Sequence, residues 1–549
     1  MPRSSVRNLL PFYLGLLLIA GLVAERLAML ARAAPTDFDD AYMYLRYANH
    51  LLAGEGVAWN PGEGQVFGVT SLLHLGVVTA LRWGFARLTP AGVLGAAAGG
   101  AAIGLVAALV AVLALHARHP RLRGNWRLWT AVVVPLVAYR EAFGFHAGTG
   151  MDTMLAALAN AGLVFATLRL AESPRLATVL WAALAAVIAV LARPDNLLCA
   201  VGCPVLALAL LAPRPRGQWL ALFAGVTVGA LALLAAGEWL ALGSPVPLSF
   251  FAKQPWYYGA FAGEFAWNPF RFLEVFGWSA GPFVVALMLF ADRDGWRRAA
   301  VLLLPALASI VVLFRFNQIM GHLGRFYYPL LPFFVAAGAL EFDAWLARGQ
   351  SLRSPATAMR AGWALVAVLL GGLALSVGAG LYAERGRDPP GLPLPAFHVA
   401  ASEPLPEIDS WQAAHAIAAI AVAAPAGARF AMSEHGLPGA LAPRVTIIDV
   451  LGLHDPYFAR HGFSAAELFR RQPDLIWLPH ADHTQMLRDI LGSAEFWAHY
   501  GFYPDAFFHG LALRKDGPHH ERLAALLAAQ WQASYPGFAL ESYQAVRGE

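Results

Sequence analysis

Charged side chains are scarce in this 549-residue chain. Asp, Glu, Lys and Arg make up 13% of it, whereas hydrophobic residue types make up 58%. A soluble protein of this length needs far more charge to cover its surface, so the composition excludes an ordinary soluble globular protein. Cysteine is scarce as well, because the two cysteines are Cys199 and Cys203, four residues apart in an apolar run. This spacing indicates apolar filler on one helix face, and it supports neither a zinc site nor a disulfide framework.

Long apolar runs recur from Leu9 to Tyr382, and many reach the roughly 20 residues that a helix needs to cross a bilayer. The first run is longer than a signal-peptide core and is interrupted by Glu25-Arg26, so we expect a retained span. Eleven spans are expected in all, near residues 9–30, 92–115, 128–147, 151–170, 176–192, 195–212, 218–240, 272–291, 299–315, 326–346 and 361–383.

Basic residues predict the orientation of these spans. Lys and Arg number 39 against 35 for Asp and Glu, and they gather in alternate short loops, such as 116–127. This pattern is typical of membrane insertion signals and argues against nucleic-acid binding. The positive-inside rule places the N-terminus in the cytoplasm of a bacterium with an inner membrane, and the C-terminal region in the periplasm. Residues 70–87 are apolar, but if they crossed the membrane, the basic loop 116–127 would lie outside. We therefore expect residues 70–87 at the outer interface.

The sequence predicts two domains. Residues 1–385 form an α-helical polytopic membrane domain, and residues 386–549 form an extracytoplasmic α/β domain after a Pro-rich linker. In the second domain, helix-like stretches (411–424, 465–471, 485–499 and 521–529) alternate with short apolar strands (429–432, 445–450, 475–478 and 511–513). The fold class expected is therefore an α-helical membrane protein with a C-terminal soluble α/β domain.

The expected first outer loop, 31–69, holds the acids that indicate chemistry. Asp37, Asp39 and Asp40 lie within four residues, just after the first span. Close carboxylates repel one another, which raises the pKa of at least one unless a cation, a substrate or water compensates. Two interpretations stay open from the spacing. One is a solvated loop that caps a helix at residues 41–53; the other is a general base for a sugar hydroxyl or a site for a divalent metal.

An ordered set of short motifs runs through the chain. Its members are Asp39-Asp40-Ala41-Tyr42, Arg46-Tyr47-Ala48, Trp59-Asn60-Pro61-Gly62, Gly68-Val69-Thr70-Ser71, Gly150-Met151-Asp152-Thr153, Arg193-Pro194-Asp195, the loop from Pro247 to Lys253, Gly324-Arg325-Phe326-Tyr327-Tyr328-Pro329, and Ile448-Asp449 with Gly452-Leu453 and Asp455. The set resembles the GT-C superfamily of polytopic glycosyltransferases, most closely the arabinofuranosyltransferases like the mycobacterial terminal arabinan enzyme. The chain departs from that pattern at Val69 and Ser71, at Asp152 where the family has Glu, and at Leu248-Ser249.

The resemblance implies a polyprenyl-phosphate-sugar donor, with arabinofuranose as the expected sugar, and an extracytoplasmic glycan or protein acceptor. Asp39 is the expected general base of an inverting transfer, and Asp40 would position the acceptor. The donor phosphate needs cations above an apolar groove, and the candidates are Lys253, Arg325, Arg193, His322 and Arg46. Substrate contacts are expected from Tyr42, Trp59, Asn60 and Asp152. For each cation, snorkelling at the interface is the alternative, and for the aromatic residues it is anchoring in the aromatic belt.

No metal site is predicted, although a divalent metal cofactor stays open. The histidines of the C-terminal domain are scattered, and His480-x-x-His483 has no further obvious ligand, so surface positions are expected for them. They are His435, His454, His480, His483, His519 and His520. A transporter or flippase for a lipid-linked sugar is the second functional class, and a binding protein is the third. The crowding of polar residues at one membrane boundary favours an enzyme over a transporter.

Overall fold

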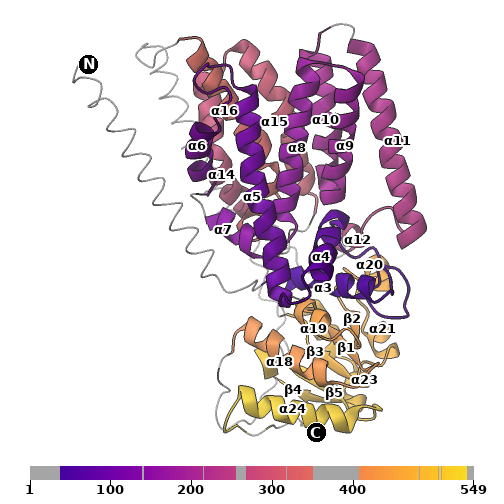
Figure 1. Ribbon diagram of the computed structural model, residues 1–549. Helices are drawn as coiled ribbons and strands as arrows, with labels where there is room; N and C mark the ends of the chain where they lie inside the picture. The colour runs from indigo at the N-terminus through magenta and orange to yellow at the C-terminus, as the bar shows by residue number, and fades with distance from the viewer. Residues whose placement is uncertain are drawn as a thin grey trace, which may run out of the picture.

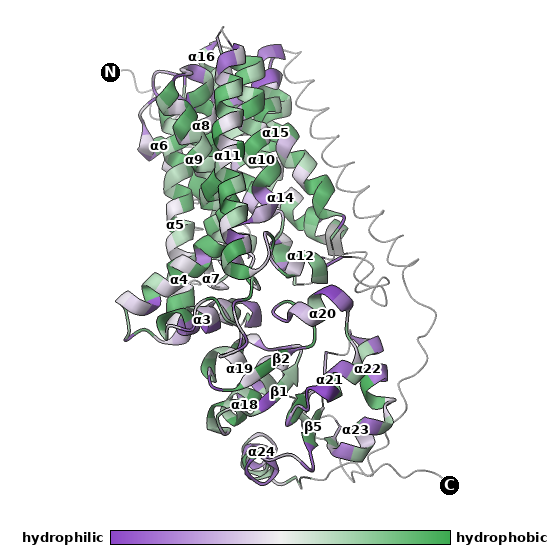
Figure 2. Cartoon of the chain, turned by 90° about the vertical axis from the view of Figure 1, so that its right-hand side faces the viewer, coloured by the Kyte–Doolittle hydropathy of each residue, from purple (hydrophilic) through white to green (hydrophobic). Residues whose placement is uncertain are grey.

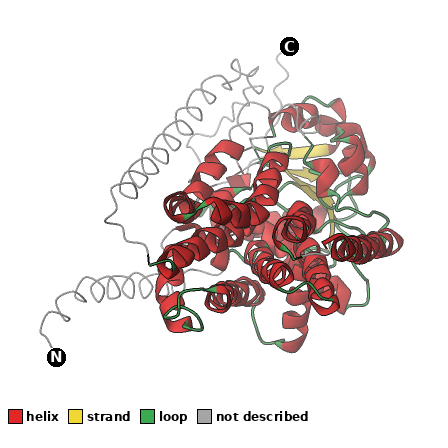
Figure 3. Ribbon diagram, turned by 90° about the horizontal axis from the view of Figure 1, so that it is seen from above, coloured by secondary structure: helices red, strands yellow, loops and turns green. Residues whose placement is uncertain are grey.

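The computed structural model describes residues 38–138, 141–213, 216–254, 268–316, 318, 320–349, 406, 408–480, 483–504, 506–508, 510–538 and 540. Figure 1 shows a bundle of long helices above a smaller domain that contains the sheet. A view from above shows the helices of the bundle packed side by side (Figure 3). The predicted domain boundary at 385/386 lies outside the described residues.

The bundle consists of α5 to α11 and α14 to α16. Their bounds are α5 Pro90–His116, α6 Trp126–Ala138, α7 Glu141–Gly148, α8 Thr153–Glu172, α9 Leu176–Ala192, α10 Leu197–Leu206, α11 Arg216–Leu242, α14 Asn268–Phe290, α15 Arg293–Leu313 and α16 Leu331–Ala347. Apolar residues dominate this bundle, and polar residues gather near its ends (Figure 2). On α11, Leu233, Trp239 and Leu240 are between 67% and 90% exposed, an outer face that suits contact with lipid.

Among the described residues, seven helices are long and apolar enough to cross a membrane. They are Pro90–His116, Thr153–Glu172, Pro194–Leu211, Arg216–Leu242, Phe272–Phe290, Arg293–Leu313 and His322–Ala347. Each coincides with one of the predicted spans. The predicted span 128–147 is α6 followed by α7, bent by 87°, and the span 176–192 is the 17-residue helix α9. The predicted spans 9–30 and 361–383 lie outside the described residues, so the total of eleven stays a prediction.

Helix α4 (Leu72–Gly84) occupies the apolar stretch that was expected at the interface. It has 13 residues, too few to cross a bilayer at 1.5 Å of rise per residue. Its N-terminus is fixed because the Ser71 side chain accepts a hydrogen bond from the backbone N–H of His74 at 3.0 Å.

The smaller domain is built on a five-stranded sheet of order β2-β1-β3-β5-β4. The strands are β1 Arg429–Met432, β2 Thr446–Asp449, β3 Leu475–Trp477, β4 Tyr500–Tyr503 and β5 Leu511–Arg514. Strand β1 pairs in parallel with β2 and β3, whereas β5 pairs antiparallel with β3 and β4. The predicted α/β character of this region is therefore confirmed, and β4 is the strand that the prediction lacked.

Helices cover this sheet on both faces. They are α18 Ser410–Ala423, α19 Gly436–Leu441, α20 Pro456–His461, α21 Ala465–Arg470, α22 Thr484–Leu491, α23 Ala494–His499 and α24 His520–Ser534. One apolar core joins α18 and α24 to Phe430 and Trp477 of the sheet. A second core joins α21, α22 and α23 to Ile476 and Phe502. The domain thus has a three-layer arrangement that holds α19 and β2 toward the bundle (Figure 1).

Helix α3 (Asp39–Leu52) joins the bundle to the α/β domain, and two of its side chains form hydrogen bonds with α19. The Asp39 carboxylate accepts the backbone N–H groups of Gly436 and Leu437, each at 2.7 Å, at the N-terminus of α19. Gly436 has to be glycine, because a Cβ atom there would collide with the backbone of Asp39. Asp39 therefore acts as a cap for a helix that lies almost 400 residues away in the sequence.

Arg46 makes the second contact, near the other end of α19. Its guanidinium donates to the backbone carbonyls of Gly439 at 2.6 Å, Val445 at 2.9 Å and Trp59 at 2.6 Å, and to the side chain of Asn60 at 2.9 Å. Burial lowers the pKa of Arg46 to about 9, so these acceptors are what keeps a fully buried cation tolerable.

We predict that Arg46→Ala destabilises the α/β domain by on the order of 3 kcal/mol, because four buried acceptors lose a charged donor. Thermal unfolding of detergent-purified protein, read together with limited proteolysis of the α/β domain, measures the effect. Arg444→Ala is the matched control, because Arg444 is exposed and adjoins the same acceptor, Val445. Equal midpoints for the two variants would contradict the assigned role.

Candidate functional site

Three cations meet at the end of the bundle that faces the α/β domain, around the ring of Phe326. Lys253 follows the short helix α12 (Ser249–Ala252), and its Nζ atom lies 5.3 Å from the ring centroid. The guanidinium carbons of Arg193 and Arg325 lie 5.3 Å and 5.7 Å from the same centroid. These side chains come from three separate loops, and we call them the cation group.

Carboxylates balance the cation group. Asp40 pairs with Arg325 at 2.9 Å, and its side chain keeps 16% of its surface exposed. Arg193 lies 2.8 Å from Asp195 and 3.6 Å from Asp152. Asp152 is fully buried, and it also accepts hydrogen bonds from the hydroxyls of Tyr44 and Thr70, both at 3.2 Å. Asp152 is therefore occupied on several sides, whereas Asp40 has one partner and access to solvent.

The pKa directions follow from this geometry. Burial lowers the pKa of Lys253 to about 8, although Asp40 opposes that effect. Burial would raise the pKa of Asp152, but the charges of Arg193 and Arg325 outweigh it and hold the pKa below its usual value. Burial would lower the pKa of Arg193, and Asp195 and Asp152 reverse the direction. The group thus contains fixed charges at Arg193 and Asp152 and one cation that titrates near neutral pH.

An apolar groove of 740 Å³ adjoins the group. It is lined mainly by side chains of α10 and α11 and of the segments beside them, among them Leu197, Val201, Val228 and Leu231. The lining also includes Glu238, Thr70, which bonds to Asp152, and Pro194, which follows Arg193. A ligand with an anionic head and an apolar tail would find cations and hydrocarbon side by side here.

Asp39 does not share the surroundings of Asp40, although the two are neighbours in sequence. Both carboxylate oxygens of Asp39 accept backbone N–H groups of α19, and 8% of the residue is exposed. Burial raises the pKa of Asp39, although the hydrogen bonds from the backbone N–H groups of Leu437 and Gly436 oppose that effect. Asp39 therefore belongs to the contact between the domains, whereas its neighbour Asp40 lies beside the cations.

The structure does not bring Arg46 into the cation group. Its donors are taken up by carbonyls of the domain contact, which argues against the predicted contact with a donor phosphate. His322 is exposed, and its ring lies 6.2 Å from that of Phe38, over which Arg325 also lies. His322 thus stands at the edge of the group.

The predicted sugar contacts Tyr42, Trp59 and Asn60 are buried where α3 and the outer loop meet the α/β domain. Trp59 stacks on His454 at 4.0 Å and donates to the Ile447 carbonyl at 3.1 Å. This burial argues against stacking of these rings on a sugar. Asp152 is the member of the predicted substrate contacts that lies at the cation group.

Sequence reasoning missed the partners that hold the group in place. Tyr44 lies between two of the sequence motifs and Thr70 inside another, and both bond to Asp152. Phe326 and Asp195 belong to two of the sequence motifs, where they follow Arg325 and Arg193, so the sequence did point to them. What the sequence does not give is which side chains of these motifs bond to one another.

Comparison with models of known protein families finds no match, and no curated protein matches the sequence. The similarity to GT-C glycosyltransferases therefore rests on the motifs, and the function is argued from the geometry of the cation group.

We predict that Asp152→Ala lowers the thermal midpoint of the purified protein clearly more than Asp195→Ala does. Both acids pair with Arg193, but Asp152 is completely buried and also accepts from two hydroxyls, whereas the Asp195 side chain is 26% exposed. Removing one partner of a buried pair costs about 3–5 kcal/mol. A larger loss for Asp195→Ala would show that the short contact to Arg193 matters more than burial.

Proposed function

We propose that this chain is a membrane glycosyltransferase of the GT-C type. It would transfer a sugar from a polyprenyl-phosphate donor to a glycan or protein acceptor, with inversion at the anomeric carbon. The observation that supports this most is the cation group, Lys253, Arg193 and Arg325, next to an apolar groove of 740 Å³. The identity of the sugar as arabinofuranose is supported by the motif resemblance alone.

In this proposal the donor phosphate lies among the cations and the isoprenoid tail lies in the groove. The acceptor oxygen attacks the anomeric carbon as the bond from that carbon to the phosphate oxygen breaks. Negative charge then grows on the leaving polyprenyl phosphate, and cations already fixed in place stabilise it. Lys253 and Arg325 supply most of this effect, because Arg193 is engaged by Asp152 and Asp195.

Asp40 would take the proton of the attacking hydroxyl. Asp40 contacts the cation group through one oxygen and keeps part of its surface open. Both oxygens of Asp195 accept from Arg193, and both oxygens of Asp39 are engaged by α19. This assignment exchanges the roles that the sequence suggested for the two acids. Asp39 would act indirectly, by holding α3 against the α/β domain.

The bundle would sit in the inner membrane of a bacterium, with the cation group and the α/β domain on the periplasmic side. The distribution of basic residues supports this orientation. The seven candidate spans support a multi-pass protein. The α/β domain borders the site through α20, which packs against α12 just before Lys253, so it would help to receive the acceptor.

We predict that Asp40→Asn lowers the rate of sugar transfer by about 10²–10⁴-fold, the usual contribution of a general base, with a fall in the thermal midpoint because Arg325 loses its counter-charge. Asp39→Asn is expected to lower the midpoint as well but to retain at least ten times the rate of Asp40→Asn. The assay supplies polyprenyl-phosphate-arabinose and candidate acceptors to purified protein and measures the released polyprenyl phosphate.

Full transfer by folded Asp40→Asn, with none by folded Asp39→Asn, would return the base to Asp39. Movement of the lipid across a vesicle membrane without release of polyprenyl phosphate would identify a transporter and contradict the proposal.

The pH dependence supplies a second test. A sugar phosphodiester keeps a single negative charge between pH 7 and 9, while Lys253, with a pKa of about 8, loses its proton as the pH rises. Donor kcat/KM should therefore fall by roughly ten-fold from pH 7 to pH 9. Lys253→Arg is the control, because a guanidinium stays charged and should flatten the profile. Parallel profiles for the two proteins would exclude Lys253 as the titrating group.

A further inference from the structure

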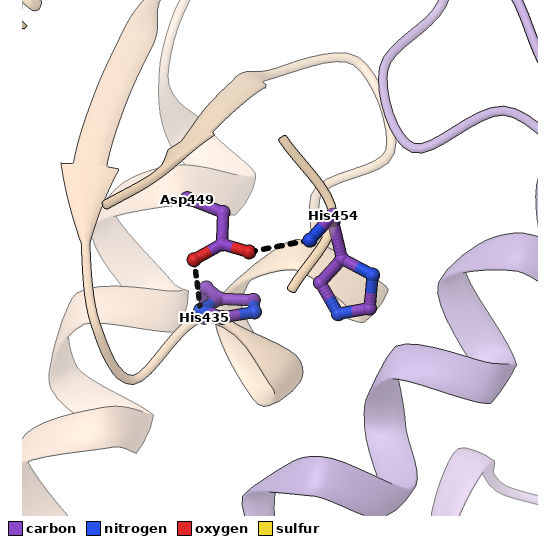
Figure 4. A group of neighbouring side chains, drawn as sticks. All are labelled: His435, Asp449 and His454. Carbon is purple, nitrogen blue, oxygen red and sulfur yellow. Dashed lines mark hydrogen bonds and ion pairs between the residues drawn. The ribbon is translucent and has the colours of Figure 1, made fainter. Parts of the chain in front are cut away.

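Three potential metal ligands meet in the α/β domain, directly against α3. His435 precedes α19, Asp449 ends β2, and His454 lies in the loop after β2. One ligand atom from each lies within 4.8 Å of the others, and all three residues are at most 2% exposed. Figure 4 shows the three residues close together, with the Asp449 carboxylate joined to the His435 ring and to the backbone N–H of His454. The expectation of surface histidines is therefore wrong for His435 and His454, and also for His483, which is buried elsewhere in the domain.

His435 carries an unused lone pair that points into this cluster. Its Nδ1 atom lies 2.7 Å from the carbonyl oxygen of Ser433, which can only accept, so Nδ1 holds the proton. The neutral ring then has a bare Nε2, and this buried atom has no hydrogen-bond partner among the described residues. In Figure 4 the Nε2 side of the ring is turned toward His454. Leaving such a group unpaired is unfavourable by about 1–3 kcal/mol, which a bound cation would offset.

Asp449 is held in place by bonds that leave metal-binding lone pairs available, whereas both ring nitrogens of His454 have contacts, one of which a bound ion would replace. Asp449 accepts the backbone N–H groups of Leu451 at 2.8 Å and His454 at 2.6 Å, one on each oxygen, and each oxygen has a further lone pair. His454 has Nδ1 at 3.1 Å from the Tyr47 hydroxyl. Its Nε2 atom lies beside the sulfur of Met43. A thioether sulfur accepts hydrogen bonds only weakly, and it can also act as a soft metal ligand.

We propose that His435, Asp449 and His454 bind a Zn²⁺ ion that fastens the α/β domain to α3. Two imidazoles and one carboxylate form an established zinc ligand set with a fourth position open. Bonds of about 2.0–2.2 Å bring the ligand atoms to roughly 3.5 Å from one another, so the side chains close by about 1 Å around the ion. The Asp39 carboxylate, bonded next to His435 at Gly436, adds a second negative charge near the cation.

The ion would act on structure through α3, which carries Met43 and Tyr47 beside the cluster and Asp40 beside the cation group. Tyr47 and Met43 of α3 touch His454, and the same ring stacks on Trp59 of the outer loop. Zinc would therefore stabilise the contact that orients α3, independently of which reaction Asp40 performs.

The test uses the full chain in detergent, freed of any affinity tag, stripped with a chelator, reloaded with ZnSO₄ and desalted. Elemental analysis should find about one zinc ion per chain, and zinc should raise the thermal midpoint. His435→Asn keeps an N–H donor for Ser433 but lacks Nε2, so it should bind at least about ten-fold more weakly and show no rise in the midpoint. His461→Ala, an exposed histidine of the same domain, should behave as the wild type.

Wild-type protein that retains no zinc and shows no rise in its midpoint would overturn the proposal, leaving a buried hydrogen-bond cluster. Retention by His435→Asn equal to wild type would overturn it as well. If His435→Asn does not fold, Co²⁺ in wild-type protein gives the answer, because nitrogen and oxygen coordination produces visible absorption bands. The absence of such bands would also overturn the site.

Discussion

The grip of α3 on α19 is the interaction on which the rest of the structure depends. Asp39 caps the N-terminus of α19 and Arg46 binds carbonyls near its other end, so the two helices run side by side in the same direction. Neighbouring residues on a helix point about 100° apart. Because Asp39 is fixed on the α/β domain, Asp40 is turned toward the bundle, where it meets Arg325. The geometry of one helix thus places two adjacent acids in different surroundings, Asp39 at the α/β domain and Asp40 at the cation group.

Charge balance explains why the cation group can exist between an apolar bundle and a folded domain. The positive charge of Arg193 faces the carboxylates of Asp152 and Asp195, and the charge of Arg325 faces the carboxylate of Asp40. Lys253 lies over Phe326 and has its pKa lowered by burial. A phosphate arriving beside Lys253 would meet the cation that lies over Phe326 without displacing the ion pairs of Arg193 and Arg325. The adjoining groove offers the apolar surface that a prenyl chain needs, so the proposed donor fits both halves of the site.

The sequence predicted the features that depend on local pattern. Apolar runs gave the seven candidate spans, and alternating patterns gave β1, β2, β3 and β5. Strand β4 was missed because residues 485–499 were predicted as one helix. The structure breaks that stretch at Gly492-Ser493 and continues past α23 into Tyr500–Tyr503.

Features that depend on distant contacts were out of reach of the sequence. Arginine is a common phosphate ligand, so the sequence suggested that role for Arg46. Its bonds to the carbonyls of Gly439 and Val445 show a structural role instead. The convergence of Asp40, Asp152, Arg193, Lys253 and Arg325 was expected from motif order, but which acid faces the cations was not. His435 and His454, separated by a strand and a helix, could not be recognised as neighbours, because their closeness is set by the packing of α19 against β2.

The central claim is that the cation group binds the phosphate of a polyprenyl lipid whose tail enters the adjoining groove. Electron cryo-microscopy of the protein in lipid nanodiscs with polyprenyl monophosphate, the product expected of the reaction, tests it most directly. The account predicts phosphate density within hydrogen-bond distance of Lys253 and Arg325, with tail density between α10 and α11. Phosphate bound at the opposite end of the bundle, or a structure in which Asp40 and Arg325 lie far apart, would contradict it.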